Sequence, residues 1–189
     1  MPSVDPALEL SRKIASQPEL RNAGTVRKVK KGEGAFRSGD ETKVFFLESG
    51  LVKLCFTSQD GREWIRSFVA APGVFSHLYL QSEQEDNIFS AMCLEDCTFT
   101  LYSYDLLRSV GVTHPDLARA GFDVVQYYLL QRERRMRNML SLSAEDAYKD
   151  FLREHANIAG RITQADTSRY LGITPVALSR IRQRMTTSA

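Results

Sequence analysis

The chain has 189 residues, of which 43% are hydrophobic and 25% are charged, and these values exclude disorder over the whole length. Cys55, Cys93 and Cys97 are too few for a disulfide framework, no apolar run is long enough to cross a bilayer, and no secretory signal is visible. We therefore expect a reduced, cytoplasmic setting, no membrane partner, and one large domain or two small ones.

Charge is distributed unevenly along the chain. Residues 1–131 contain 14 basic and 17 acidic side chains, whereas residues 132–189 contain 11 basic and 6 acidic ones. Net charge is informative about binding partners rather than about fold. This division indicates an N-terminal part that senses a signal and a basic C-terminal part that binds an anionic partner. On charge alone, a solvated basic helix end is the alternative.

The first 20 residues predict one short leading helix bounded by Pro6 and Pro18. Its apolar positions are Leu8, Leu10, Ile14 and Leu20. From about Val26 to Tyr104, short β-prone runs end in turn residues at intervals of roughly 8–12 positions, which predicts an antiparallel sandwich or roll. Cys97, Phe99 and Leu101 alternate with polar residues, the period of a half-buried strand.

After Tyr104 the apolar period becomes helical, and it predicts a long helix over residues 117–140 with two neighbouring apolar stripes. One stripe consists of Ala118, Phe122, Val125, Leu129, Arg132, Met136 and Leu140, and the other of Leu117, Gly121, Val124, Tyr128 and Gln131. Two stripes need two partners, so we expect the roll on one side and a second copy of the helix on the other. The predicted dimer contacts are Phe122, Val125, Leu129 and Met136. A single wide stripe buried inside a monomer is the alternative.

The next helix is predicted to begin after Ser143, because Ser143 and Asp146 resemble a capping box. It includes Ala147, Phe151 and Leu152, and it ends by Asn157 or Gly160.

Residues 162–185 predict two short helices joined by a tight turn. Thr163 is a helix cap, Gly172 ends the first helix, and Thr174-Pro175 begins the second. The expected apolar face of the first helix is Ala165, Tyr170 and Leu171, with Ile173 at the corner. The expected buried face of the second is Leu178, Ile181 and Met185.

This pair of helices is typical of a helix-turn-helix whose second helix reads DNA. Arginine forks match the guanine acceptors of the major groove, while hydroxyl groups and helix N-termini meet phosphates. The predicted DNA contacts are Thr163, Gln164, Thr174, Pro175, Val176, Ser179, Arg180, Arg182 and Arg184. A structural helical hairpin with a basic outer face is the alternative.

Residues 162–185 resemble the helix-turn-helix of the Crp/Fnr family of bacterial transcription regulators, above all in Leu171-Gly-Ile-Thr-Pro and Leu178-Ser-Arg-Ile-Arg182. The front half resembles the family's cyclic-nucleotide-binding roll in Gly32, Phe36, Gly39-Asp40, Phe46, Gly50-Leu-Val52, Asp60-Gly61 and Pro72-Gly-Val-Phe75. The resemblance implies an α+β chain with an antiparallel β-roll or jelly roll, a long dimerisation helix and a C-terminal all-α domain. The implied domains are a sensor over 1–113, a dimerisation helix over 114–141 and a helix-turn-helix domain over 142–189.

The front half departs from the family where relatives hold a cyclic phosphate. Asn87 and Ile88 replace the family's Arg-Ser pair, and three acids, Glu83, Glu85 and Asp86, lie close by. Each lost contact costs on the order of 1–3 kcal/mol, so we expect no cyclic-nucleotide binding of the usual kind. The candidate pocket for an unknown small-molecule effector comprises Phe75, Ser76, His77, Asn87, Ile88 and Tyr128.

Other cofactor chemistries of the family receive little support. No cysteine precedes Cys55, which excludes the family's N-terminal iron–sulfur cluster, and Pro2 with His77 is a weak pattern for haem. Cys93 and Cys97 are predicted on one strand, as buried apolar residues or alternatively as a redox pair. No nucleophile–base pair, carboxylate pair or metal-ligand spacing occurs, so we expect no enzyme, no cofactor and no metal.

The expected function is DNA-binding transcription regulation by a homodimer that recognises a palindromic site, with RNA polymerase as a further candidate partner. Val176 stands where relatives carry glutamate, and the chain ends four residues after Met185 without space for a β-hairpin wing. These two departures favour an alternative, a ligand-binding or protein-interaction module whose degenerate helix-turn-helix no longer reads DNA.

Overall fold

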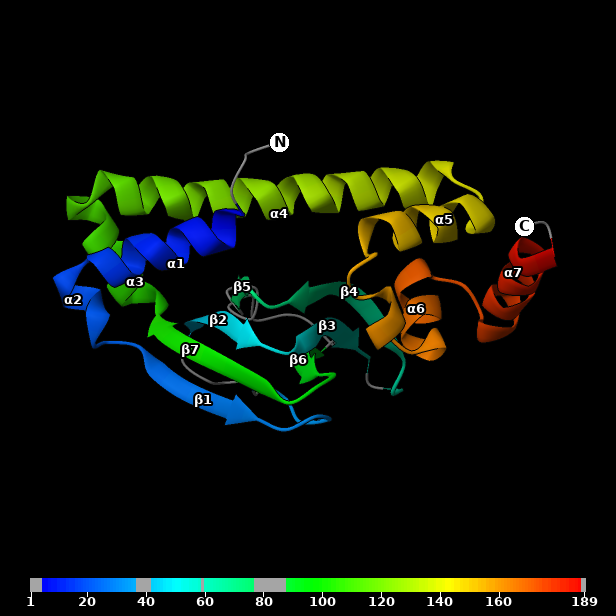
Figure 1. Cartoon of the computed structure of the whole chain (residues 1–189), viewed down its shortest axis with the longest axis horizontal. Helices are drawn as coiled ribbons and strands as arrows, with labels where there is room; N and C mark the ends of the chain where they lie inside the picture. Colours follow the sequence, from blue (N-terminus) through cyan, green and yellow to red (C-terminus); the bar gives the residue numbers. More distant parts are fainter. Residues whose placement is uncertain (1–4, 37–41, 59, 77–87, 188–189) are drawn as a thin grey trace.

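The computed structural model describes residues 5–36, 42–58, 60–76 and 88–187 (Figure 1). The N-terminal and roll elements are α1 (Pro6–Ser16), α2 (Pro18–Arg21), β1 (Thr25–Val29), β2 (Lys43–Ser49), β3 (Leu51–Thr57), β4 (Glu63–Ala70), β5 (Gly73–Ser76), β6 (Ile88–Cys93) and β7 (Cys97–Ser103). The elements that follow are α3 (Tyr104–Thr113), α4 (Pro115–Ser141), α5 (Ala144–Glu154), the 3-10 turn η2 (Ala159–Arg161), α6 (Gln164–Leu171) and α7 (Pro175–Thr187). The fold is α+β, as the sequence predicts.

Two antiparallel sheets form the roll, with strand orders β1-β7-β2-β5 and β4-β3-β6. Gly50 makes the turn between β2 and β3 at a φ of 101°, and a Cβ there would lie 2.6 Å from the Cys97 sulfur. The turn therefore requires glycine, since a side chain would meet both backbone strain and a clash.

The space between the sheets is filled by apolar side chains, among them Phe36, Phe45, Phe75 and Phe99. The rings of Phe45 and Phe75 stack with their centroids 5.1 Å apart. The predicted alternation along β7 is confirmed, because Cys97, Phe99 and Leu101 are all buried.

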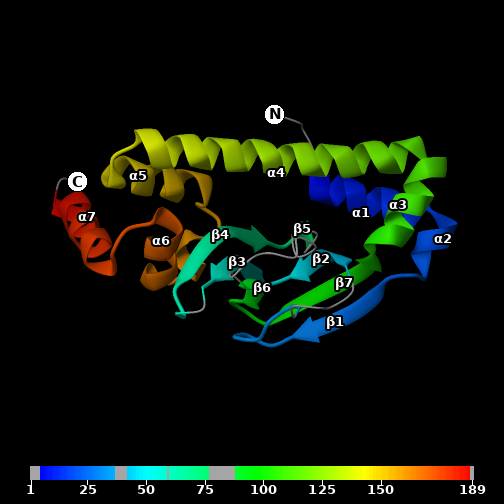
Figure 2. The same ribbon diagram turned by 180° about the vertical axis from the view of Figure 1, so that it is seen from behind.

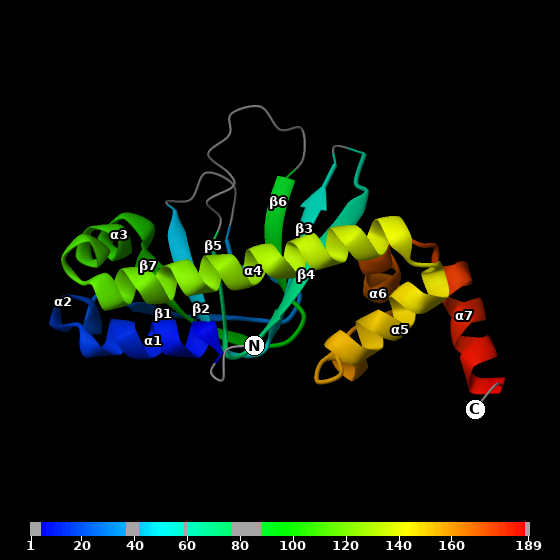
Figure 3. The same ribbon diagram turned by 90° about the horizontal axis from the view of Figure 1, so that it is seen from above.

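Helices cover the outer faces of both sheets. The first sheet packs through Phe46 and Val74 against α1, α3 and α4, and the second packs through Leu51, Ile65 and Phe68 against α5, α6 and α7. Figures 2 and 3 show α4 running along most of the molecule, with α1–α3 at one end and α5–α7 at the other, where α7 extends beyond α4. The C-terminal helices therefore rest on the roll itself.

The leading helix predicted between Pro6 and Pro18 is confirmed as α1, but Leu20 lies in the separate helix α2, because Gln17 is extended and Pro18 begins a new turn. Cys93 and Cys97 do not share a strand, since Cys93 ends β6 and Cys97 begins β7. Both are buried free thiols, and burial raises the pKa of Cys93 to about 12, which fits small core residues.

No helix within the described ranges is both long enough and apolar enough to span a bilayer.

Candidate nucleic-acid interface

The first helix of the C-terminal pair begins at a complete side-chain cap. The Thr163 hydroxyl accepts the Asp166 N–H at 3.0 Å and donates to the Asp166 carboxylate at 2.8 Å. Thr163 and Gln164 are exposed beside this N-terminus, where free backbone N–H groups and the helix dipole favour an anion.

The buried face of α6 differs from the predicted one. Asp166, Thr167 and Ser168 are buried, whereas Ala165 is exposed. The expectation assigned the buried face by apolarity, but the polar groups on this side all have partners: Asp166 pairs with Lys53 of the roll, and the Thr167 and Ser168 hydroxyls donate to the carbonyls of Thr163 and Ala165. Tyr170 and Leu171 are half-buried, as part of the same cluster.

The turn between the helices has the predicted geometry. Gly172 is left-handed at a φ of 69°, and the backbone N–H of Ile173 donates to the Ser168 carbonyl at 3.0 Å. The Thr174 hydroxyl then accepts the Ala177 N–H at 3.1 Å, and Pro175 is the first residue of α7. At the turn, the end of α6 and the start of α7 are therefore both capped by hydrogen bonds to groups only a few residues away in the sequence.

Helix α7 buries one side and presents the other to solvent. Leu178 and Ile181 are buried, and Met185 is half-buried in the same cluster. The exposed predicted contacts on this helix are Pro175, Val176, Ser179, Arg180, Arg182 and Arg184. Three arginines and no acid on a 13-residue helix give this surface a positive charge.

The three arginines are not equivalent. Arg184 lies 3.4 Å from the Glu145 carboxylate of α5, whereas the side chains of Arg180 and Arg182 have no ionic or hydrogen-bonding partner among the described residues. Arg180 and Arg182 are therefore available to a ligand without breaking an internal contact.

A buried ionic cluster fastens α6 to the roll. Nζ of Lys53 on β3 lies 2.7 Å from Glu63 on β4 and 3.0 Å from Asp166 on α6. Burial by itself would lower the pKa of Lys53, but hydrogen bonds to Glu63 and Asp166 outweigh it and raise the pKa. Arg169 lies 3.4 Å from the same two carboxylates, so both acids are paired.

Arg135 of α4 makes a second connection between the elements. It donates to the carbonyls of Ile65 and Arg66 on β4 and, at 2.7 Å, to the carbonyl of Tyr170 on α6. Its guanidinium carbon also lies 4.2 Å from the centre of the Tyr170 ring. One side chain therefore joins the long helix α4, the roll and α6.

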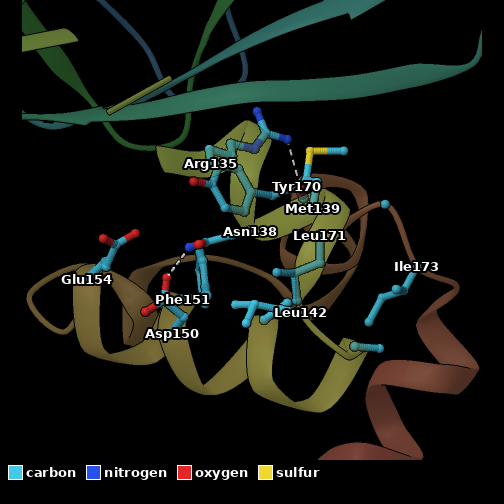
Figure 4. Close-up of a pocket in the computed structure, with 13 residues that line it drawn as sticks. Arg135, Asn138, Met139, Leu142, Asp150, Phe151, Glu154, Tyr170, Leu171 and Ile173 are labelled. Carbon is cyan, nitrogen blue, oxygen red and sulfur yellow. Dashed lines mark hydrogen bonds between the residues drawn. The ribbon is translucent and has the colours of Figure 1, made fainter. Parts of the chain in front are cut away.

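A cavity of about 280 Å³ lies at this junction, between the end of α4, α5 and the α6–α7 turn (Figure 4). Leu142, Leu171 and Ile173 form an apolar side, while Asp150 accepts a hydrogen bond from Asn138. The sequence offered no signal for this cavity, for Arg135 or for Lys53, because their partners are distant in the chain.

The exposed stripe of α4 contains the residues predicted to form the dimer contact. Phe122, Val125, Leu129 and Met136 are 65%, 64%, 52% and 53% exposed. The neighbouring stripe faces the protein interior, where Leu117 and Val124 are buried and Tyr128 is half-buried. The structure thus decides which of the two stripes is covered by the roll.

The described residues of the candidate effector pocket are not brought together. Phe75 points between the sheets, while Tyr128 packs with Val74 on the opposite face of β5, because adjacent strand residues alternate. Ser76 ends β5, and Ile88 begins β6. Pro2, His77, Glu83, Glu85, Asp86 and Asn87 lie outside the described residues. No group of three or more His, Cys, Asp or Glu residues able to hold a metal occurs in the described segments.

Comparison with known proteins defines the class of fold. A family model described as "Cyclic nucleotide-binding domain" matches residues 26–113. FixK2 from Bradyrhizobium japonicum has a similar structure, with a TM-score of 0.73, 21% identity, and coverage of 87% of this chain and 85% of the other. A CooA mutant from Carboxydothermus hydrogenoformans has a TM-score of 0.72 and 16% identity, with coverage of 95% and 85%.

A putative transcriptional regulator of the Crp/Fnr family from Eubacterium rectale is similar with a TM-score of 0.73 and 15% identity, covering 97% of this chain and 89% of the other. No curated protein sequence is similar enough to count as a relative. The chain therefore has the roll, long helix and C-terminal helices of these structures, which establishes its fold.

Proposed function

We propose that this protein is a DNA-binding transcription regulator of the Crp/Fnr type. The observation that carries the proposal is the exposed, positively charged side of α7, held by a fully capped turn in the arrangement of a recognition helix. The fold it shares with FixK2 and with the Crp/Fnr regulator from Eubacterium rectale supports the same function.

The regulator acts as a homodimer through α4. Four large apolar side chains that are each at least half exposed lie on one stripe of a 27-residue helix, and a second copy of the stripe would remove them from water. In this proposal residues 1–113 sense, residues 114–141 dimerise, and residues 142–189 bind DNA. A cytoplasmic location, an unknown small-molecule effector and RNA polymerase as a partner belong to the same proposal.

Selection from random duplex DNA, followed by sequencing, tests the function. A two-fold dimer presents its recognition helices about 34 Å apart, so the selected sites should be palindromes with half-sites about 10 base pairs apart. Arg180→Ala should flatten the preference at one position per half-site and cost about 1–3 kcal/mol, because a guanine fork is lost.

Arg184→Ala is compared with Arg180→Ala on the same helix, and Glu145→Ala accounts for the ion pair that Arg184 makes with Glu145. Loss of a phosphate contact should weaken binding to all DNA sequences equally, and the slope of log affinity against log salt concentration should fall by about one. A selection that returns no palindrome favours the protein-interaction module instead. If both variants lose affinity equally for all sequences, Arg180 does not read a base.

The sensor roll binds no cyclic nucleotide in the usual way. Asn87 and Ile88 lack the charge and hydroxyl of a phosphate-binding pair, and the described interior of the roll is filled with phenylalanine rings. Calorimetry with cyclic AMP and cyclic GMP should give dissociation constants no tighter than about 1 mM. A micromolar constant for either nucleotide would contradict this part of the proposal.

A further inference from the structure

One stripe of α7 lies opposite its buried side. Successive residues are about 100° apart around a helix axis, so the side chains of Val176 and Gln183 point in directions that differ by only about 20°. Arg180 lies about 40° to one side of Val176, and Ser179 lies about 60° to the other. Half-buried Met185 is diametrically opposite Val176, so these four exposed residues form the face that points farthest from the protein.

Gln183 is exposed on this stripe and free to bind. Its backbone carbonyl accepts from the Thr187 hydroxyl, but its side-chain amide has no hydrogen-bond partner among the described residues. Val176 is 61% exposed and has no polar group. Arg180 and Gln183 are therefore the two planar, multiply bonding side chains of the stripe, separated by less than one helical turn.

The chemistry of these two side chains selects different bases. A guanidinium fork matches the two acceptors of guanine, whereas a side-chain amide with one donor and one acceptor matches the N6 donor and N7 acceptor of adenine. The rise from residue 180 to residue 183 is about 4.5 Å, close to the roughly 3.4 Å step between base pairs. Neighbouring base pairs are thus within reach of the two side chains.

We infer that Gln183 is a specificity-determining residue that reads an adenine next to the guanine read by Arg180. This inference rests on the proposed DNA-binding function and adds a second base to it. The side chains of Arg182 and Arg184 project about 100° to either side of Gln183, toward the walls of a DNA groove that would contain the stripe. They contact phosphates and contribute affinity without sequence preference.

Three proteins are compared by selection from random duplex DNA: the wild type, Gln183→Ala and Gln183→Glu. The wild type should select adjacent guanine and adenine in each half-site. Gln183→Ala should reduce the preference for that adenine about tenfold while the other positions keep theirs. Gln183→Glu should move the preference from adenine to cytosine, since a carboxylate accepts from the cytosine N4 amino group.

Arg182→Ala serves as the control on the same helix, and it should lower affinity evenly without changing any base preference. Circular dichroism checks that each variant remains folded, which is expected because Gln183 is exposed and glutamine, alanine and glutamate all favour helices. If the wild type selects a palindrome but the adenine preference persists in both Gln183 variants, the inference is wrong although the proposed function stands. If the wild type selects no sequence, the proposed function fails and the inference fails with it.

Discussion

His155 is a titratable residue at the centre of the contact between the roll and the C-terminal helices. Its ring lies against Phe68 and Phe151, and its Nε2 is 3.3 Å from the Tyr170 hydroxyl. Burial lowers the pKa of His155, and the nearby Arg135 charge lowers it further, while Asp150 acts in the opposite direction. The structure therefore favours the neutral imidazole.

Acidification should weaken the fold through His155. The pKa of a histidine in the unfolded chain is about 6.5, and that of His155 in the folded protein is lower. The contribution of neutral His155 to the free energy of unfolding is therefore complete above about pH 6.5, and it is lost as the pH falls through the folded pKa. The midpoint of thermal unfolding of the wild type should thus fall as the pH drops below about 6.5.

His155→Phe keeps an aromatic ring in the cluster but removes the titrating group. At pH 7.5 the variant should cost about 1–3 kcal/mol, because the phenyl ring is larger and the contact with the Tyr170 hydroxyl is lost, but its midpoint should fall less on acidification. Equal pH dependence in the two proteins would assign the effect to other groups.

At the scale of single elements, α4 carries two neighbouring apolar stripes that have different environments. Its interior stripe packs on the roll, and its outer stripe exposes Phe122, Val125, Leu129 and Met136. The sequence predicted both stripes but left open which of them meets the roll. Burial of Leu117, Ala120 and Val124 answers that question.

The exposed stripe predicts a dimer that two charges should dissociate. Val125→Arg combined with Leu129→Arg places two cations in the contact without touching the interior stripe. Each apolar residue contributes about 1.5–3 kcal/mol on burial, and the added charges must also be desolvated, so the dimer should be lost at micromolar concentration. Sedimentation should give about twice 21.4 kDa for the wild type and 21.4 kDa for the variant.

Arg119→Ala on the same helix provides the comparison for this experiment, because Arg119 is exposed outside both stripes and its removal should leave the dimer intact. A wild type that sediments as a monomer would contradict the assignment.

At the scale of the whole molecule, the C-terminal helices are docked on the roll by polar contacts that accompany a large apolar cluster. Lys53 is 13% exposed and Asp166 is 7% exposed as side chains, so their ion pair is shielded from water. Lys53 and Arg169 together balance Glu63 and Asp166, so removing Lys53 leaves one negative charge uncompensated, and an uncompensated buried charge typically costs about 3–5 kcal/mol.

Lys53→Met should therefore loosen the docking of α6 and α7. Hydrogen exchange should become faster at the interface between β3, β4 and α6, while β1 and β7 stay protected. Adding Asp166→Asn removes the orphaned charge and should restore part of the protection. Arg161→Ala breaks the exposed contact with Glu95 and should cost only about 0.2–1 kcal/mol. Similar effects of Lys53→Met and Arg161→Ala would show that the buried pair does not hold the docking.

The amino-acid sequence by itself determined the local structure of the C-terminal helices and the helical period of α4. Thr163, Gly172, Thr174 and Pro175 act on backbone groups within a few residues, so their effects follow from sequence neighbours alone. The class of fold was predictable for a similar reason, because turn spacing and apolar periods reflect local geometry.

Only the tertiary structure decided which faces are buried and which charges are paired. Asp166 follows the Thr163 cap by three residues, but its burial is compensated by Lys53, 113 residues away in the chain. The outward direction of the α4 stripe and the bonds from Arg135 to Tyr170 likewise depend on which elements meet. Burial and ion pairing are properties of contacts between distant segments, and a pattern of neighbours along one chain does not contain them.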